Sequence, residues 1–272
     1  MDSHRRGAAF SHASGSASDM RILILGGTLE ARQLGERLAC RAGAAVTLSL
    51  AGRTASPAPQ AVPIRTGGFG GTAGLADYLK SERIDVLIDA THPYATIISA
   101  NAAQAAQATG VRFLALRRSP WLPEPGDRWL DVETMPEAVS ALGATPRRVF
   151  LALGRKDLVP FEAAPQHHYL IRSVDPVWPP LALPKADYVT ARGPFREIDE
   201  RTLLSTHAID TVVAKNSGGA ASYGKIGAAR ALGLSVIILR RPPLPPVSFV
   251  ETVEEVFTWL DHGCLPDAIR GV

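Results

Sequence analysis

A weak internal repeat constrains the fold of this 272-residue chain more than any other feature of its sequence. Residues 110–118 match residues 233–241, 123 positions further on, in their apolar run and in the Arg-Arg pair that closes it. Val132-Glu-Thr-x-x-Glu137 recurs 118 positions later as Val250-Glu-Thr-x-x-Glu255. Matches in chain order at a nearly constant offset are typical of a duplicated unit, so we expect two similar lobes.

Within each repeat, short apolar runs alternate with segments of helical spacing. Asp85-Val-Leu-Ile corresponds to Asp210-Thr-Val-Val, and 149–154 resembles 22–26 in pattern. Such alternation predicts parallel strands buried on both faces and joined by helices. We therefore predict an α/β protein with two similar doubly wound, mostly parallel Rossmann-like lobes and a cleft between their strand ends. The expected divisions are a disordered extension at 1–19, a first lobe at 20–145 and a second lobe at 146–272.

The segment Arg21-Ile-Leu-Ile-Leu-Gly-Gly-Thr-Leu-Glu-Ala-Arg32 predicts a strand, a glycine turn and a helix. Two glycines let a backbone approach a ligand closely, and a helix N-terminus offers N–H groups and partial positive charge to a phosphate. We expect a nucleotide site at Gly26, Gly27 and Thr28, with the Thr28 hydroxyl as a further donor. The turn lacks the full G-x-G-x-x-G fingerprint, and a helix packed tightly on a sheet would also explain two glycines.

The second predicted strand ends in Ala51-Gly52-Arg53-Thr54. An NAD site usually places an acidic residue there for the ribose hydroxyls, whereas a guanidinium suits the 2′-phosphate of NADP. The sequence therefore favours NADPH over NADH, unless Arg53 is an ordinary solvated arginine.

Polar residues follow the strand at 85–88, and ligands of open α/β sheets bind beyond the carboxyl ends of the strands. Asp89, Thr91, His92 and Tyr94 thus fall where chemistry is expected. A glycine-rich loop at 67–71, which contains Gly68, is either a mobile turn or a backbone that lies close to a ligand.

The strand ends of the second repeat carry cations instead. They place near one rim the residues Arg155, Lys156, Arg172, Arg192 and Lys215. Such a rim suits a ligand with several carboxylates, because guanidinium groups pair with planar oxyanions. The alternative is a set of solvated loop charges.

Composition narrows the classes of function. The net charge is only +3 and no basic run exceeds two residues, so no nucleic-acid surface is predicted. No apolar segment predicts a membrane span or a secretion signal. Cys40 and Cys264 show no metal or redox spacing, which favours a reducing, cytoplasmic location. His167 and His168 are adjacent and would point to opposite faces of a strand, so no metal site is predicted.

As a set, the motifs of residues 20–262 resemble those of the precorrin-6A reductases, NADPH-dependent enzymes of cobalamin biosynthesis. The segments that carry the resemblance are Leu25-Gly-Gly-Thr28, Ala51-Gly-Arg53, Gly67-Gly-Phe-Gly-Gly71, Ile88-Asp-Ala-Thr-His-Pro-Tyr94, Ala164-Pro-Gln-His-His168, Ala191-Arg-Gly-Pro-Phe195 and Ala214-Lys-Asn-Ser-Gly-Gly219.

The resemblance implies hydride transfer from NADPH to one double bond of the precorrin-6A macrocycle, giving precorrin-6B, without flavin or metal. It implies a first lobe that binds NADPH through Gly26, Gly27, Thr28, Arg53, Thr54, Gly68 and Thr91. The second lobe would bind the tetrapyrrole polycarboxylate through Arg155, Lys156, Arg192, Lys215, Asn216, Ser217 and Gly218, with 216–219 as a closing loop. Asp89, His92 and Tyr94 are the candidate proton donors, and neighbouring pathway enzymes are the expected partners.

Three other classes of protein are weighed against this interpretation. A short-chain dehydrogenase is disfavoured because no tyrosine has a lysine four positions later. A two-lobed nucleotide-sugar-dependent transferase would also hold a nucleotide between α/β lobes. A non-catalytic two-lobed binding protein would normally be exported, and no signal sequence is apparent.

Overall fold

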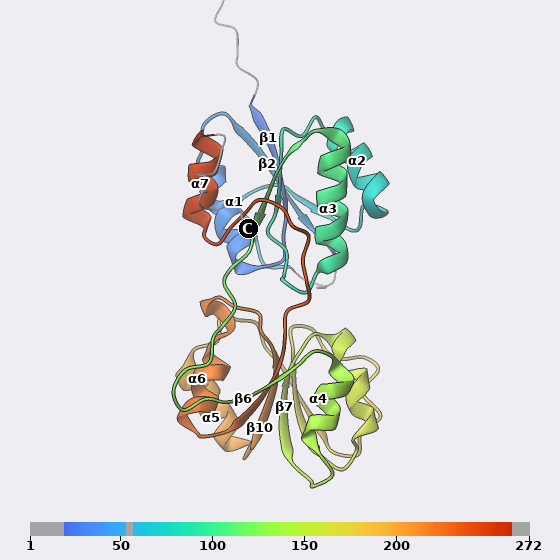
Figure 1. The fold of residues 1–272 in the computed structure, drawn as a ribbon, viewed down its shortest axis with the longest axis vertical. Coiled ribbons are helices and arrows are strands. Elements are labelled where there is room, and N and C mark those ends of the chain that lie inside the picture. The colour runs from blue at the N-terminus through green and yellow to red at the C-terminus, as the bar shows by residue number, and fades with distance from the viewer. Residues whose placement is uncertain (1–18, 53–56, 263–272) are drawn as a thin grey trace, which may run out of the picture.

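In a computed structural model, which describes residues 19–52 and 57–262, two six-stranded sheets lie at opposite ends of the molecule (Figure 1). The first sheet has the order β12-β5-β4-β1-β2-β3, and every pair in it is parallel. Its strands are β1 (Met20–Leu25), β2 (Ala44–Leu50), β3 (Ile64–Thr66), β4 (Val86–Asp89), β5 (Arg112–Leu116) and β12 (Phe249–Val250).

The second sheet has the order β6-β11-β10-β7-β8-β9 and is parallel throughout. Its strands are β6 (Arg128–Val132), β7 (Arg148–Ala152), β8 (His168–Ser173), β9 (Ala186–Thr190), β10 (Thr211–Lys215) and β11 (Ser235–Leu239). Read position by position, the two orders are the same topology, with β1 equivalent to β7 and β5 equivalent to β11. The predicted pair of doubly wound lobes is confirmed.

Helices cover both faces of each sheet, as the buried strands require. In the first lobe α1 (Leu29–Ala39) and α7 (Val253–His262) pack on one face, and α2 (Gly71–Ser81) and α3 (Thr96–Thr109) pack on the other (Figure 1). In the second lobe α4 (Met135–Leu142) covers one face, and α5 (Glu197–Thr206) and α6 (Gly224–Ala231) cover the other. The remaining elements are the 3-10 turns η1 (Arg155–Asp157), η2 (Val159–Ala163) and η3 (Ala220–Ser222).

The repeated Glu-Thr-x-x-Glu motifs begin equivalent helices in the two lobes. Thr134 caps α4 through the Glu137 backbone N–H, and the Glu137 side chain reaches back to the Glu133 N–H. Thr252 and Glu255 make the same reciprocal contacts at the start of α7. Each motif is a capping box, which satisfies backbone donors that a helix start would leave unpaired.

Each lobe takes its edge strand from the other half of the chain. After β5 the chain leaves the first lobe and supplies β6 and α4 to the second, where β6 pairs with β11. After β11 it returns and supplies β12 and α7 to the first lobe, where β12 pairs with β5. The predicted boundary between 145 and 146 is therefore corrected: residues 128–142 belong to the second lobe, and 249–262 belong to the first. The predicted extension lies outside the described residues except for Asp19.

Two connections consequently cross side by side between the lobes (Figure 1). We call residues 117–127 the outgoing connection and residues 240–248 the returning connection. The carboxyl ends of the strands of both sheets face this crossing, because residues that follow β4 contact Ser217, which follows β10, and Leu239, the last residue of β11. The predicted site region is thus the junction of the lobes.

Candidate functional site at the junction of the lobes

The turn after β1 leaves its backbone open to close approach at one of its two glycines. Gly27 has a φ of +115°, which is strained for any residue with a side chain, and a Cβ added there would enter open space. Gly26 serves packing instead, since a Cβ there would lie 2.6 Å from Leu48 Cδ1. The helix that follows is 11 residues long, so its N-terminus carries unpaired N–H groups and partial positive charge. These features fit the pyrophosphate of a dinucleotide.

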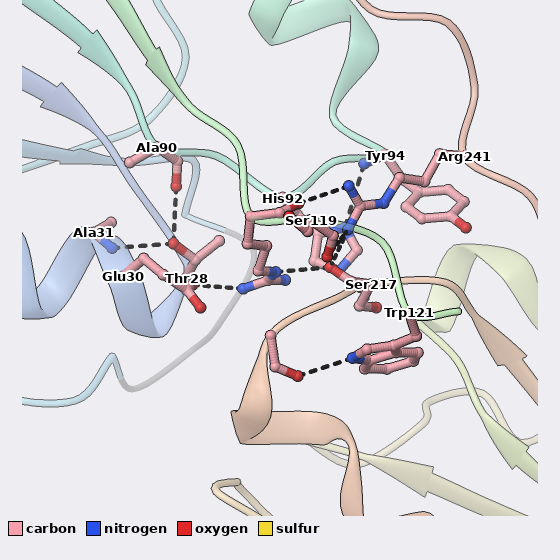
Figure 2. Close-up of polar contacts among 12 residues, drawn as sticks. Thr28, Glu30, Ala31, Ala90, His92, Tyr94, Ser119, Trp121, Ser217 and Arg241 are labelled. Carbon is pink, nitrogen blue, oxygen red and sulfur yellow. Dashed lines mark hydrogen bonds and ion pairs between the residues drawn. The ribbon is translucent and has the colours of Figure 1, made fainter. Parts of the chain in front are cut away.

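Thr28 caps this helix. Its hydroxyl accepts the Ala31 N–H at 3.1 Å and donates to the Ala90 carbonyl at 2.8 Å (Figure 2). The hydroxyl proton is therefore engaged with the loop after β4. The hydroxyl predicted as a further donor to phosphate thus has an acceptor within the protein, and the role of the backbone N–H groups of the turn stays a prediction.

The region after β2 is described only in part. Arg53 and Thr54 lie outside the described residues. The neighbouring glycine loop is held by Arg65, which donates to the carbonyl oxygens of Gly67 at 2.6 Å and Gly68 at 2.8 Å. The Arg65 guanidinium also stacks 3.7 Å from the centre of the Phe69 ring. This arrangement fixes the backbone at Gly68 beside the edge of the sheet.

The residues after β4 bond to the protein rather than projecting into an open space. Asp89 is 4% exposed, and its carboxylate accepts the backbone N–H and the hydroxyl of Thr91, at 3.1 and 2.6 Å. His92 Nδ1 accepts the Tyr94 N–H at 3.3 Å, which leaves the ring proton on Nε2, 3.1 Å from Ser217 Oγ. The Tyr94 hydroxyl donates to the Leu239 carbonyl and accepts the Asn216 N–H. Both aromatic residues thus reach across to the second lobe (Figure 2).

Burial shifts the pKa values of both residues. The pKa of His92 is lowered from 6.5 to about 3 by burial and by the cations Arg118, Lys215, Arg241 and Lys225. The pKa of Tyr94 is raised to about 12, mainly by burial. At neutral pH both side chains are therefore uncharged: His92 is a neutral imidazole and Tyr94 is a neutral phenol.

The loop after β10 is fixed against the outgoing connection. The Asn216 side chain accepts the Trp121 N–H at 2.8 Å and donates to the Trp121 carbonyl at 2.9 Å. A Cβ at Gly218 would lie 2.2 Å from the Ser119 carbonyl oxygen, and the Gly219 carbonyl accepts the Trp121 indole N–H. The glycines therefore permit a close approach of two backbones, and the predicted closing motion of 216–219 stays a prediction.

Arg172 is not part of the cationic rim. It is 7% exposed, forms an ion pair with Glu200 of α5, and stacks 3.6 Å from the centre of the Phe195 ring. Lys215 lies at the rim but forms an ion pair with Asp157 at 2.6 Å. The exposed cations at these strand ends are Arg155, Lys156 and Arg192.

Three charged residues at the junction were not singled out from the sequence. Glu30 in the first turn of α1 pairs with Arg118 of the outgoing connection at 2.5 Å. Arg118 Nε and Arg241 Nη2 both donate to the Ser217 carbonyl, at 2.7 and 3.0 Å (Figure 2). Arg118 and Arg241 are equivalent positions of the repeat, so the Arg-Arg pairs that revealed the duplication were the signal that pointed to them.

The remaining pocket, the histidines and the hydropathy of the helices add no residue to the site at the junction. A half-open pocket of about 390 Å³ lies at the amino ends of β1 and β2, away from the junction. Within 19–52 and 57–262, no cluster of His, Cys, Asp or Glu could hold a metal ion. His167 is buried beside the Arg147 N–H, whereas His168 pairs with Asp187. No helix in the described part of the chain is long and apolar enough to cross a membrane.

Fold and junction together define a two-lobed α/β protein whose first lobe has a strand, Gly-Gly turn and helix after β1. The family model for the precorrin-6x reductase CbiJ/CobK matches residues 21–261, and the chain belongs to this family. It is 56% identical over 246 residues to a precorrin-6A reductase of Sinorhizobium sp, covering 90% of this chain and 94% of that one. It is 51% identical to the precorrin-6A reductase of Rhodobacter capsulatus, with 93% and 99% covered.

The fold agrees with a solved structure of the same family. A structure described as CobK precorrin-6A reductase superimposes with a TM-score of 0.87 at 49% sequence identity. The superposition covers 92% of this chain and all of the other. The resemblance to precorrin-6A reductases seen in the sequence motifs is therefore confirmed along nearly the whole chain.

Proposed function

We propose that this protein is a precorrin-6A reductase of cobalamin biosynthesis that uses NADPH to reduce one double bond of the macrocycle, giving precorrin-6B. The observation that carries the proposal is the 56% identity to a precorrin-6A reductase over 90% of the chain. The nicotinamide supplies a hydride, and the protein supplies binding, orientation and one proton. The substrate gains two hydrogen atoms, and NADPH leaves as NADP⁺.

The cofactor is proposed to bind in the first lobe. The turn at Gly26 and Gly27 supports this assignment, with backbone N–H groups toward the pyrophosphate. Gly68 and Thr91 lie beyond neighbouring strand ends, where the rest of a dinucleotide would extend. Arg53, together with Thr54, is the proposed determinant for NADPH over NADH, from its place in the sequence after β2.

The substrate carboxylates are proposed to bind at the second lobe. Arg155, Lys156 and Arg192 are exposed at the carboxyl ends of β7 and β9 and supply the cations. Lys215 lies at the same rim, where a substrate carboxylate would have to compete with Asp157 for it. Asn216, Ser217 and Gly218 are assigned a supporting role, since their bonds hold the junction that borders this rim.

His92 is the proton donor that we propose among the three candidates. Asp89 is bound to Thr91, and the Tyr94 hydroxyl proton is donated to Leu239. The low pKa of His92 arises partly from nearby cations. Negative charge that the bound substrate brings close to the imidazole would raise its pKa, because negative charge favours the protonated form. The substrate itself would then prepare the acid that completes its reduction.

The activity is tested by incubating the purified protein with precorrin-6A and NADPH. We expect loss of NADPH absorbance in step with a product that is heavier by two hydrogen atoms in mass spectrometry. Arg53→Ala should weaken NADPH binding by about 1.5–3 kcal/mol, the range of a charged hydrogen bond, and leave NADH binding nearly unchanged. A protein that binds a nucleotide sugar but not NADPH would refute the proposal in favour of a transferase. The cytoplasmic location and contact with neighbouring pathway enzymes stay predictions.

A further inference from the structure

The outgoing connection carries a cation to the start of α1. Arg118 Nη1 lies 2.5 Å from Glu30 Oε2, and the two side chains are only 14% and 19% exposed. Arg118 Nε donates to the Ser217 carbonyl at 2.7 Å, so the same guanidinium touches the second lobe (Figure 2). A charge from outside the first sheet therefore lies at the helix N-terminus to which the proposed function assigns the cofactor pyrophosphate.

The guanidinium retains capacity for an anion. Within residues 19–52 and 57–262 its hydrogen bonds use Nη1, toward Glu30, and Nε, toward Ser217, which leaves Nη2 for a further acceptor. The cavity beside it, of about 10 Å³, is lined by Thr28, Glu30, Thr91, Pro93, Leu116 and Arg118. This space holds at most about one water, so a phosphate group can enter only if the ion pair shifts.

Glu30 is an unexpected neighbour for a phosphate. A carboxylate in the first turn of α1 interacts favourably with the helix dipole, but it repels a bound anion. Pairing with Arg118 compensates the carboxylate. A pyrophosphate in the turn would compete for the same guanidinium, whose planar fork suits phosphate oxygens.

We infer that Arg118 is a phosphate-binding residue of the cofactor site and that Glu30 holds its guanidinium in place until the pyrophosphate arrives. The inference rests on the proposed function. Arg118 also bonds to Ser217, whose hydroxyl contacts His92. A shift of the Arg118 guanidinium toward the cofactor would therefore change the contacts of the loop that borders the proposed proton donor.

The test measures dissociation constants by fluorescence titration with NADPH and by calorimetry with 2′-phospho-ADP-ribose, which keeps the pyrophosphate but lacks nicotinamide. Arg118→Met should weaken both ligands about 10-fold or more, as loss of a charged contact does, and Arg118→Lys should weaken them less. Glu30→Gln should tighten both several-fold, because it removes a negative charge and releases the guanidinium. Binding of 2′-AMP, which lacks the pyrophosphate, should be unchanged in every variant.

Arg241→Met is the matched control, since Arg241 occupies the equivalent position and also bonds to Ser217, but its hydrogen bonds go to the carbonyls of 118, 119, 216 and 217 rather than to α1. It should leave dinucleotide affinity within about twofold, a free-energy change well below that of a charged contact. If Glu30→Gln weakens NADPH as Arg118→Met does, the ion pair is only structural and the inference is wrong. Unchanged affinity in Arg118→Met would also overturn it. Failure of the wild-type protein to bind either NADPH or 2′-phospho-ADP-ribose would overturn the proposed cofactor site itself.

Discussion

The two lobes share one strand order yet differ in the turn that follows their equivalent first strands. In the first lobe β1 leads through Gly26 and Gly27 into an 11-residue helix. In the second lobe β7 leads through Gly154 into two short 3-10 turns, and no α-helix precedes β8 in that described segment. A 3-10 turn of three residues has no aligned stack of peptide dipoles to offer a phosphate. The same topology therefore has a glycine turn leading into an α-helix after β1 but not after β7.

The second lobe places side-chain charge where the first places backbone donors. Arg155 and Lys156 occupy the turn itself, and Asp157 beside them binds Lys215. Such a turn favours carboxylates held by flexible cations, whereas the first favours a phosphate close to the main chain. The comparison indicates that the duplicated topology fixes where the strand ends lie, whereas the residues of each turn set the chemistry of the ligand that the turn favours.

Loss of the first-lobe turn should have the largest effect. Gly27→Val places a β-branched residue at a φ of +115° and fills the space that we assign to the pyrophosphate. We expect NADPH binding to become undetectable in a fluorescence titration while circular dichroism shows a folded protein. Gly154→Ala is the control at the equivalent turn, where φ is −73°, a conformation open to any residue, and an added Cβ would lie 3.1 Å from Asp157 Oδ2. Equal loss of NADPH affinity in both variants would contradict the difference between the lobes.

The stability of the second lobe should depend on its buried ion pair. Arg172→Ala leaves Glu200 charged and unpaired at 3% side-chain exposure, so the free energy of unfolding should fall by about 3–5 kcal/mol. The double variant Arg172→Met, Glu200→Leu should recover much of this loss in urea unfolding. Arg196→Ala, which breaks an exposed pair in the same region, should leave the midpoint nearly unchanged. A loss below about 1 kcal/mol, the range of an exposed pair, would contradict the stabilising role assigned to this buried pair.

His92 of the first lobe and Ser217 of the second lobe occupy equivalent positions of the repeat and contact each other. Variants at these two positions therefore test whether the lobes have different roles at the junction. His92→Gln keeps a hydrogen-bond donor but cannot transfer a proton, so kcat should fall by about 100-fold with little change in KM. In the wild type kcat should decline as pH rises through the pKa of the substrate complex, and the variant should lose this decline. Ser217→Ala should lower kcat by far less. A variant with the wild-type pH profile would remove His92 from the mechanism.

The same residue predicts how stability varies with pH in the ligand-free protein. The folded pKa of about 3 lies below the usual 6.5, so between these values the unfolded state binds a proton that the folded state does not. Stability should therefore fall as pH falls from 6.5 toward 3, by at most about 1.4 kcal/mol per pH unit from this group. His92→Gln should show a correspondingly shallower decline in urea unfolding.

The exposed rim of the second lobe should give the smallest effect. Arg192→Ala should weaken the tetrapyrrole by about 10-fold at low salt and leave NADPH affinity intact, since one exposed charge is partly screened. The difference from wild type should shrink in high salt. Arg128→Ala, an exposed cation at the amino end of β6, is the control and should not alter substrate binding. Equal effects of the two variants would reduce the rim to general electrostatic attraction.

Local sequence determined the elements and much of the phosphate turn. The four apolar residues from Ile22 to Leu25 are fully or nearly buried in β1, and Gly27 has the positive φ that its type permits. Periodicity and turn chemistry act within a few residues of the chain, so they can be recognised without knowledge of the fold. The repeat likewise predicted two equivalent lobes, because equal patterns form equal units.

Only the tertiary structure decided which lobe each edge strand joins and which charges are available. β6 and β12 follow matching motifs, and nothing local in them specifies the sheet that they complete. Arg172 and Lys215 were both predicted to lie at a binding rim. Their ion-pair partners, Glu200 and Asp157, are 28 and 58 residues away in sequence, so no local pattern reveals the pairing. Strand exchange and ion pairing depend on groups brought together by the folded chain, so the contact between His92 and Ser217, 125 residues apart, exists only once both lobes have formed.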